Sequence, residues 1–246
     1  LHEREDVQVL HYPLEHECGT YDYLKIRSSD IGPGDKVIII RASLHGDEIA
    51  GAYSMLYHLD KIFDYAHGQG VKLIVYPLAN PSGFERNERY NGDGDKGDYV
   101  NNHFLQYERE DGTFVKDIEE RNEFKRWYWA SDPQLHIRLA PETALLHKLL
   151  KEDPLSQVVA VIDLHQDYFT EGVGSAAYHY ANEHPEVYRA IVDQIAAIIP
   201  ILGNVDIGAG FNTSMVSDAQ GFILRHDGSL PDLLYRMGVV HGITPE

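Results

Sequence analysis

Two strand patterns, each followed by a histidine, constrain the fold of this chain more than any other feature. Residues 36–51 read KVIIIRASLHGDEIAG, and residues 158–167 read VVAVIDLHQD. Continuous β-branched and apolar runs of this kind are typical of strands buried on both faces of a parallel sheet. The first run leads into His45 and the second into His165. The sequence therefore predicts two central strands of an open α/β sheet, with both histidines at the carboxyl edge, where such sheets place their sites.

The segments around the first run alternate between strand and helix. Apolar residues recur at helical spacing over residues 49–65, Gly68 and Gly70 follow, and residues 71–76 form another apolar run. Strand, helix and strand in this order predict a βαβ unit. The other expected elements are a hairpin strand around 24–26, a long loop at 80–102, an amphipathic stretch at 119–129, a helix at 141–151, a strand at 174–180, a helix at 185–199, and a helix end, turn and strand at 233–244. We expect one α/β domain over residues 1–246, with a mixed, mostly parallel sheet flanked by helices.

The charge balance argues against some classes of partner. Lys and Arg number 21 and Asp and Glu 39, which gives a net charge of −18. Such an acidic protein is unlike those that bind nucleic acids or anionic membranes. No stretch reaches the roughly 18 apolar residues of a membrane span. The single cysteine, Cys18, excludes an internal disulfide. We expect a soluble protein, and the cytoplasm is slightly favoured as its location. The sequence leaves open whether a signal peptide precedes Leu1. It does not indicate the oligomeric state.

His45 and Glu48, three residues apart after the first run, are candidate metal ligands. An imidazole nitrogen and a carboxylate oxygen from one turn suit Zn²⁺, which binds both at about 2.0–2.2 Å. The same pattern also arises by chance, as two solvated side chains on a helix surface. The second strand–histidine junction favours the metal interpretation, because His165 can then supply the third ligand. The remaining histidines His147, His179 and His184 are expected in surface or capping roles.

With these motifs in place, the chain resembles the zinc carboxypeptidase superfamily, including its succinylglutamate desuccinylase/aspartoacylase branch. Residues 45–48, HGDE, resemble the first metal motif of that superfamily, and His165 its third ligand. Residues 80–84, NPSGF, are similar to its Asn-Pro-x-Gly turn, and residues 97–104, GDYVNNHF, to the segment that holds a substrate carboxylate. The stretch 228–246 is similar to the closing segment that presents the catalytic glutamate.

The resemblance implies one Zn²⁺ per chain, held by His45, Glu48 and His165, and a carboxypeptidase-like fold. It also implies that Glu246 is the general base and that Arg89 polarises the substrate carbonyl, with Arg86 as the alternative arginine. Members of the superfamily continue beyond this glutamate, which implies a longer natural chain. From the residues alone, Asp163 is expected on the same strand face as His165, where a carboxylate can orient an imidazole.

Two departures from the superfamily pattern concern the substrate. Asn102 stands where the family has its carboxylate-binding arginine, and a neutral amide cannot form a charged fork with a carboxylate. Asn101, beside it, is a candidate for lining the site or for capping the loop. The mobile tyrosine that often precedes the catalytic glutamate has no counterpart in residues 219–227. Arg225, in the same stretch, is a candidate for supplying the positive charge that is lost at Asn102.

These residues predict a zinc-dependent amide hydrolase acting on a peptide or an N-acyl amino acid. A carboxypeptidase-like enzyme is the first interpretation, because the Asn-Pro-x-Gly turn and the closing segment resemble that branch most. An N-acyl amino-acid deacylase is the alternative, favoured by the short HGDE motif and the compact loop after it. A catalytically inactive binding module, with zinc or without metal, is the alternative of another class, because of Asn102 and the missing tyrosine.

Overall fold

The fold is organised around one large sheet, seen in a computed structural model that describes residues 4–16, 19–91, 103–118, 124–167, 175–207, 215–239 and 241–246. The strands are β1 Val7–His16, β2 Gly19–Ser28, β3 Lys36–Ala42, β4 Val71–Tyr76, β5 Leu105–Glu108, β6 Phe114–Val115, β7 Arg126–Trp129, β8 Val158–Leu164, β9 His179–Ala181, β10 Phe222–Leu224 and β11 His241–Pro245. The helices are α1 Ala50–Gly68, α2 Pro81–Arg86, α3 Pro141–Glu152, α4 Arg189–Ala196 and α5 Leu230–Arg236, and 3₁₀ turns lie at Pro133–Leu135, Leu155–Gln157 and Pro185–Tyr188.

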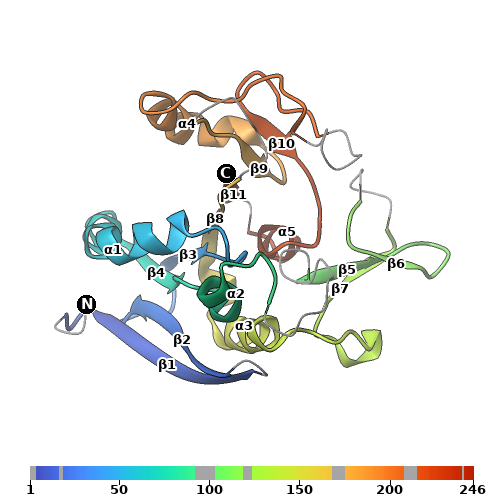
Figure 1. Cartoon of the computed structure of the whole chain (residues 1–246), viewed down its shortest axis with the longest axis horizontal. Coiled ribbons are helices and arrows are strands. Elements are labelled where there is room, and N and C mark those ends of the chain that lie inside the picture. Colours follow the sequence, from blue (N-terminus) through green and yellow to red (C-terminus); the bar gives the residue numbers. More distant parts are fainter. Residues whose placement is uncertain are drawn as a thin grey trace.

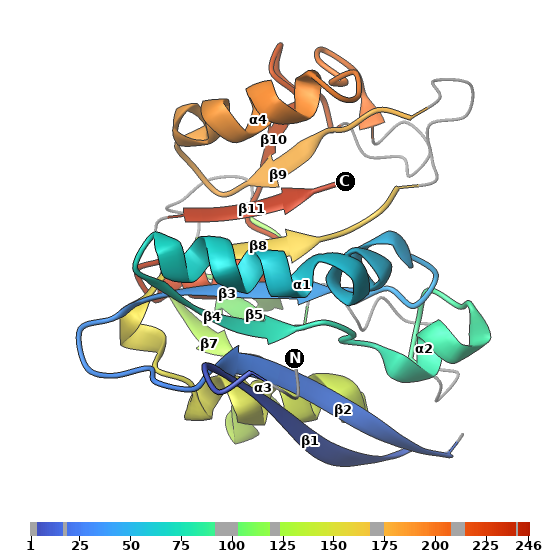
Figure 2. The ribbon, with the colours of Figure 1, turned by 90° about the vertical axis from the view of Figure 1, so that its left-hand side faces the viewer.

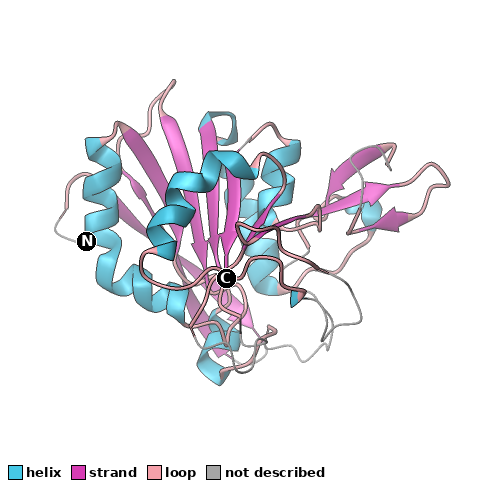
Figure 3. Cartoon of the chain, turned by 90° about the horizontal axis from the view of Figure 1, so that it is seen from above, coloured by secondary structure: helices cyan, strands magenta, loops and turns pink. Residues whose placement is uncertain are grey.

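The large sheet has eight strands in the order β1-β2-β4-β3-β8-β11-β9-β10 (Figure 1). Its four central strands, β4, β3, β8 and β11, run parallel to one another, whereas β1, β2 and β9 pair in antiparallel fashion with a neighbour. A small antiparallel sheet, β6-β5-β7, projects from one side (Figure 3). The expected fold, a mixed and mostly parallel sheet flanked by helices, is confirmed.

Helices cover both faces of the sheet because its central strands are apolar on both faces. Ile39 packs in a cluster with side chains of α3 and α5, and its neighbour Ile40 packs on the opposite face with α1. Ile162 of β8 contacts both the α1 cluster and the α4 cluster, so these two helices share a face. Figure 2 shows α1 and α4 in front of the strands and α3 behind them.

The predicted βαβ unit is present as β3, α1 and β4, with β3 and β4 in parallel register from Lys36 and Val71 onward. The long loop expected at 80–102 contains a short helix instead, α2, because Asn80 caps it: the Asn80 side-chain oxygen accepts a hydrogen bond from the Gly83 N–H at 2.9 Å. Residues 92–102 lie outside the described part of the chain. At 119–129 the described residues contain the strand β7, and the strand expected at 174–180 begins only at residue 179.

Three of the parallel strands bring distant segments to one edge. Ala42 and Leu164, the last residues of β3 and β8, are paired in the sheet, so His45 and His165 leave the same edge. The His165 N–H donates to the Pro245 carbonyl at 3.1 Å, which fixes the end of β11 beside the end of β8. Residues 45, 165 and 246 are thereby placed together by the strand register.

Two of the histidines expected in surface or capping roles are in the core. His147 is 1% exposed, and its Nε2 lies 2.8 Å from the His103 carbonyl, to which it donates. His179 is fully buried against the Phe222 ring. His184 is exposed, as expected. Within the described residues, no helix is long and apolar enough to cross a membrane.

Candidate metal and catalytic site

The turn after β3 has a tightly specified backbone. A Cβ atom on Gly46 would lie 2.1 Å from the backbone carbonyl carbon of Gly83, so only glycine fits against α2 there. The Gly46 N–H donates to the Arg89 carbonyl at 3.2 Å, and the Ser43 hydroxyl donates to the Glu48 carbonyl at 3.0 Å. These contacts close the turn on itself and place the segment that carries Arg89 next to it.

His45, Glu48 and His165 converge on one point. Their side-chain donor atoms all lie within 4.8 Å of one another, and all three residues are buried. Nδ1 of His45 lies 2.6 Å from one Glu48 oxygen, and Nδ1 of His165 lies 3.0 Å from the other. The two imidazole rings meet edge to face, with centroids 5.0 Å apart. We call these three residues the donor group.

The charges in the donor group are strongly perturbed by burial and by one another. Burial lowers the pKa of His45 to about 4, so its imidazole is neutral at pH 7 and keeps a lone pair for a ligand. Burial opposes ionisation of Glu48, but His165 and His45 outweigh it and hold the pKa of this carboxyl well below its usual range. Burial also disfavours a charged His165, yet Asp163, Glu246 and Glu48 together raise its pKa well above the ordinary value.

This donor group fits a divalent metal ion. Neither ring nitrogen of His165 makes a well-aligned hydrogen bond to a described residue, although carboxylates lie on both sides of the ring. A cation between the histidines and Glu48 would bind Nδ1 of His165, the nitrogen that faces Glu48, and offset the buried negative charge. Two imidazoles and one carboxylate are also a donor set that catalytic zinc sites use.

A buried ion pair lies next to the His165 ring. Arg41 and Asp163 lie opposite each other on β3 and β8, and both are fully buried. Arg41 Nε donates to Asp163 Oδ1 at 2.7 Å, and its Nη2 contacts Oδ2. Oδ2 also lies 3.3 Å from Nε2 of His165, the nitrogen that faces away from Glu48. Burial opposes the charge on Asp163, but Arg41 and His165 prevail and keep its pKa below the usual range.

Arg89 lies at the donor group. Its Nη1 donates to Glu48 Oε1 at 2.8 Å, and the side chain remains 31% exposed. The alternative arginine, Arg86, pairs instead with Glu88 at 2.9 Å. Of the two, Arg89 is therefore the one placed to reach a substrate bound at this edge.

Glu246 completes the group of side chains at the edge. One of its oxygens lies 3.7 Å from Nδ1 of His165. Burial raises the pKa of Glu246 to about 8; the nearby His165 lowers it, and Glu48 and Asp167 raise it further. A carboxyl group that gains and loses its proton close to neutral pH is suited to general acid–base work.

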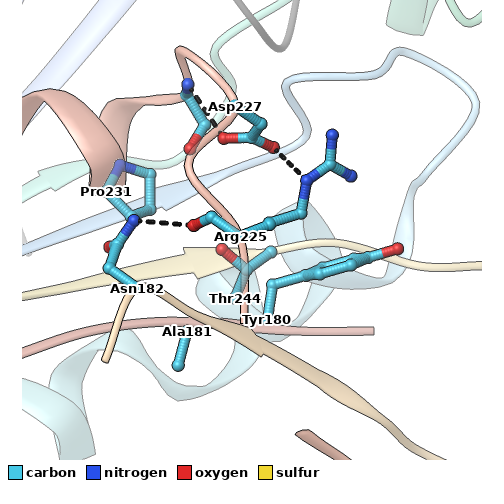
Figure 4. Close-up of a pocket in the computed structure, with 8 residues that line it drawn as sticks. Tyr180, Ala181, Asn182, Arg225, Asp227, Pro231 and Thr244 are labelled. Atoms are coloured by element: carbon cyan, nitrogen blue, oxygen red, sulfur yellow. Dashed lines mark hydrogen bonds and ion pairs between the residues drawn. The ribbon is translucent and has the colours of Figure 1, made fainter. Parts of the chain in front are cut away.

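Of the three predicted substrate-binding residues, one lies in the described part of the chain. Asn101 and Asn102 lie outside the described residues. Arg225 stacks over the Tyr180 ring and pairs with Asp227 at 3.0 Å (Figure 4). It lines a polar pocket of about 30 Å³ together with Thr244, two residues before Glu246. This volume is close to that of a single water molecule, so Arg225 as a substrate ligand stays a prediction.

Two charged residues near the donor group, Arg41 and Asp167, were not predicted from the sequence. Arg41 is one charged residue in an otherwise apolar strand run, and a charge at such a position needs a buried partner. That partner, Asp163, stands near the end of the other strand run, so the two charges were readable as a pair. Asp167, two residues after His165, lines a cavity with His165 and Glu246.

An open, largely parallel sheet with this buried group at the carboxyl edge places the chain in a structural class, the α/β proteins with a carboxypeptidase-like fold. The chain belongs to the succinylglutamate desuccinylase/aspartoacylase family, whose catalytic-domain model matches residues 33–219. The resemblance to the zinc carboxypeptidase superfamily is thereby confirmed, and the family is one of hydrolases. Comparison with curated proteins gives no match.

Solved structures agree with this fold. A candidate metallopeptidase from Shewanella baltica OS155 is 22% identical with a TM-score of 0.64, over 97% of this chain and 77% of that one. Murein-tripeptide amidase from Escherichia coli O157 is 17% identical with a TM-score of 0.51, over 98% and 82% of the two chains. Succinylglutamate desuccinylase/aspartoacylase from Rhodobacter sphaeroides is 15% identical with a TM-score of 0.52, over 99% and 58%.

Proposed function

We propose that residues 1–246 act as one zinc-dependent amide hydrolase domain that cleaves a peptide or an N-acyl amino acid. The observation that carries this proposal is the donor group itself: three buried side chains from two strand ends converge within 4.8 Å, beside Glu246. The family match supports the same reaction type, because its members are named for removing an acyl group from an amino acid.

His45, Glu48 and His165 would hold the zinc ion in this proposal. Zinc bound there would supply a Lewis acid for the substrate carbonyl and lower the pKa of a water in its open position toward ~7. Asp163, held by Arg41, orients the His165 ring through the nitrogen that faces away from Glu48. The ring is then fixed before any substrate arrives.

In this proposal Glu246 transfers the proton, and Arg89 stabilises the negative charge that develops during the reaction. The Glu246 carboxylate takes a proton from the attacking water and returns it to the nitrogen of the leaving amine. The amide C–N bond breaks, and the products are a carboxylate and an amine. Arg89 stabilises the negative charge that develops on the carbonyl oxygen, a role that often contributes most to the rate.

The two substrate classes, N-acyl amino acids and peptides, are each supported by a different observation. The family model favours an N-acyl amino acid. The Asn-Pro-x-Gly turn at 80–83, which the structure holds buried against the HGDE turn, supports the carboxypeptidase-like alternative. Both classes share one reaction, addition of water to an amide carbonyl.

Metal analysis followed by hydrolysis assays tests the proposal. We expect one zinc ion per chain, and release of amino acids that stops with a chelator and resumes with zinc. Parallel panels of short peptides and N-acyl amino acids then identify the substrate class. His45→Ala should lose zinc and activity together, whereas the exposed His184→Ala is the matched control. Zinc at one per chain without turnover of either panel contradicts the proposal and favours a binding module.

A further inference from the structure

Arg89 belongs to no helix or strand, so its position depends on contacts with other segments. Its carbonyl oxygen accepts two hydrogen bonds, one from the Gly46 N–H at 3.2 Å and one from the Asn80 side-chain nitrogen at 3.4 Å. These two donors hold the backbone at Arg89, while Nη1 of its side chain reaches Glu48 at 2.8 Å. The direction in which the guanidinium group points therefore depends in part on how the Asn80 amide is held.

The Asn80 amide is fully buried, and its oxygen is shared by several donors. The Gly83 N–H donates to this oxygen at 2.9 Å, and the Asn91 side-chain nitrogen donates to it at 3.4 Å. The Ser82 hydroxyl also lies 3.4 Å from the same oxygen. A hydroxyl has one hydrogen to donate, so Ser82 competes with the other two donors unless a different acceptor takes that hydrogen.

Glu142 is that acceptor. The Ser82 hydroxyl donates to Glu142 Oε1, which is a closer partner than the Asn80 oxygen. Glu142 stands in the first turn of α3, 60 residues further along the chain, and is 1% exposed. Its other oxygen lies 3.8 Å from Nε2 of the buried His16 side chain. Burying a carboxyl group costs free energy that only specific partners offset, and these partners place Oε1 against the Ser82 hydroxyl.

We propose that Glu142 is a positioning residue for Arg89. By accepting the hydrogen bond from Ser82, it leaves the Asn80 amide to hold the Arg89 backbone. The inference rests on the proposed amide hydrolysis, in which Arg89 stabilises negative charge on the carbonyl oxygen. Because this charge develops in the transition state, loss of the arrangement should lower kcat more than it raises KM.

The test uses two substitutions of Glu142 in the zinc-loaded protein. Leucine removes the acceptor at similar volume, whereas glutamine keeps an oxygen that can accept the Ser82 hydrogen. With the best substrate from the peptide and N-acyl panels, we expect Glu142→Leu to lower kcat about tenfold, with KM within about twofold and zinc still at one per chain. Glu142→Gln should retain at least about half of the wild-type kcat. Glu142→Ala, which also lacks the acceptor, is measured in parallel in case Glu142→Leu does not fold.

Removing the competing hydroxyl distinguishes positioning from a general loss of structure. In a Ser82→Ala background, Glu142→Leu should lower kcat by no more than about twofold, because no hydroxyl remains to occupy the Asn80 oxygen. In an Arg89→Ala background its effect should be equally small, because the group being positioned is absent. Glu152→Leu alters the exposed far end of the same helix and should keep the wild-type kcat. A tenfold loss that persists in either background overturns the inference, as does a wild-type kcat in both Glu142→Leu and Glu142→Ala.

A second measurement needs no turnover. Phenylglyoxal labels arginine side chains, and peptide mass spectrometry gives the labelling rate at Arg89 alone. We expect Glu142→Leu to label about threefold faster than the wild type, and the difference to disappear when Ser82→Ala is added. If no substrate is cleaved while labelling changes in this way, the proposed function fails and the positioning role stands. Equal labelling rates in the wild type and Glu142→Leu contradict the positioning role itself.

Discussion

Glu246 combines two properties that are expected of a general acid–base group. It lies within 3.7 Å of a nitrogen of the donor group, and burial raises its pKa to about 8. A structural carboxylate in a protein interior is normally paired with a cation, which lowers its pKa. A carboxyl group whose pKa is instead raised by burial, beside a group of candidate metal ligands, is typical of residues that transfer protons in active sites.

We therefore expect Glu246→Gln to abolish turnover without loss of zinc. General acid–base groups contribute about 10²–10⁴-fold to rate, so kcat should fall by a factor in that range. Glutamine keeps the size of the side chain and cannot accept the proton. Steady-state kinetics and metal analysis of the same preparation measure both quantities. The exposed Glu110→Gln is the control, and wild-type activity in Glu246→Gln would remove this residue from the mechanism.

At the scale of elements, the register between β3 and β8 determines the site. Arg41 and Asp163 face each other in this register, and their ion pair joins the two strands just before the turns that carry His45 and His165. A slip of one residue between these strands would move one partner of the ion pair to the other face of the sheet. The pair is fully buried, so removing one partner leaves an uncompensated charge in the core.

Arg41→Met tests this ion pair. Breaking a buried pair from one side typically costs about 3–5 kcal/mol, and we expect a loss of that size in the free energy of unfolding. Urea unfolding of the chelator-treated protein measures it without a contribution from metal. Lys72→Met breaks the exposed Lys72–Asp30 pair, whose nitrogen and oxygen are 2.7 Å apart, and should cost less than about 1 kcal/mol. Equal effects of the two substitutions would contradict this account of the core.

The sequence predicted the elements on which the site depends because their patterns are long and consistent. The β-branched run before His45, the helical spacing after Glu48 and the apolar run before His165 each indicate one type of element. The rules on βαβ units predicted that β3 and β4 run parallel in one sheet. Convergence of the three side chains followed from the position of both strand ends at one edge.

The elements that the sequence missed are short and held by tertiary contacts. Helix α2 has six residues in a segment rich in glycine and asparagine, and it depends on the Asn80 cap. Strand β6 has two residues and exists through its pairing with β5. His147 and His179 are polar residues whose burial depends on partners far along the chain, such as the His103 carbonyl and the Phe222 ring. Local patterns carry no information about such partners.

At the scale of the whole molecule, these two buried histidines make stability depend on pH. Burial lowers the pKa of both His147 and His179 to about 4, whereas an ordinary histidine has a pKa of 6.5. Between pH 6.5 and 4 the unfolded chain therefore binds protons that the folded chain does not. Stability contributed by these groups is present above pH 6.5 and is lost as the pH falls toward 4.

His179→Phe should make the stability less sensitive to acid. Each unit of pKa difference corresponds to about 1.4 kcal/mol, so His179 accounts for roughly 3 kcal/mol of the loss between pH 6.5 and 4. Urea unfolding at several pH values in this window measures the slope, whatever the absolute stability of the variant. The exposed His184→Phe should keep the wild-type slope. A His179→Phe protein with an unchanged slope would show that His179 titrates normally in the folded state.

Metal binding should stabilise the whole fold, because the donor group ties the ends of β3 and β8 together around buried negative charge. A ligand present at about a thousand times its Kd adds about 4 kcal/mol to the free energy of unfolding. For a chain of this length that corresponds to a rise in Tm of roughly 10 °C. We expect a chelator to lower Tm by such an amount, zinc to restore it, and magnesium, which prefers oxygen ligands, to have little effect. His45→Ala should respond to neither chelator nor zinc, whereas His184→Ala should behave as the wild type. A wild-type Tm that is the same with zinc and with chelator would mean that the three side chains converge for a reason other than metal binding.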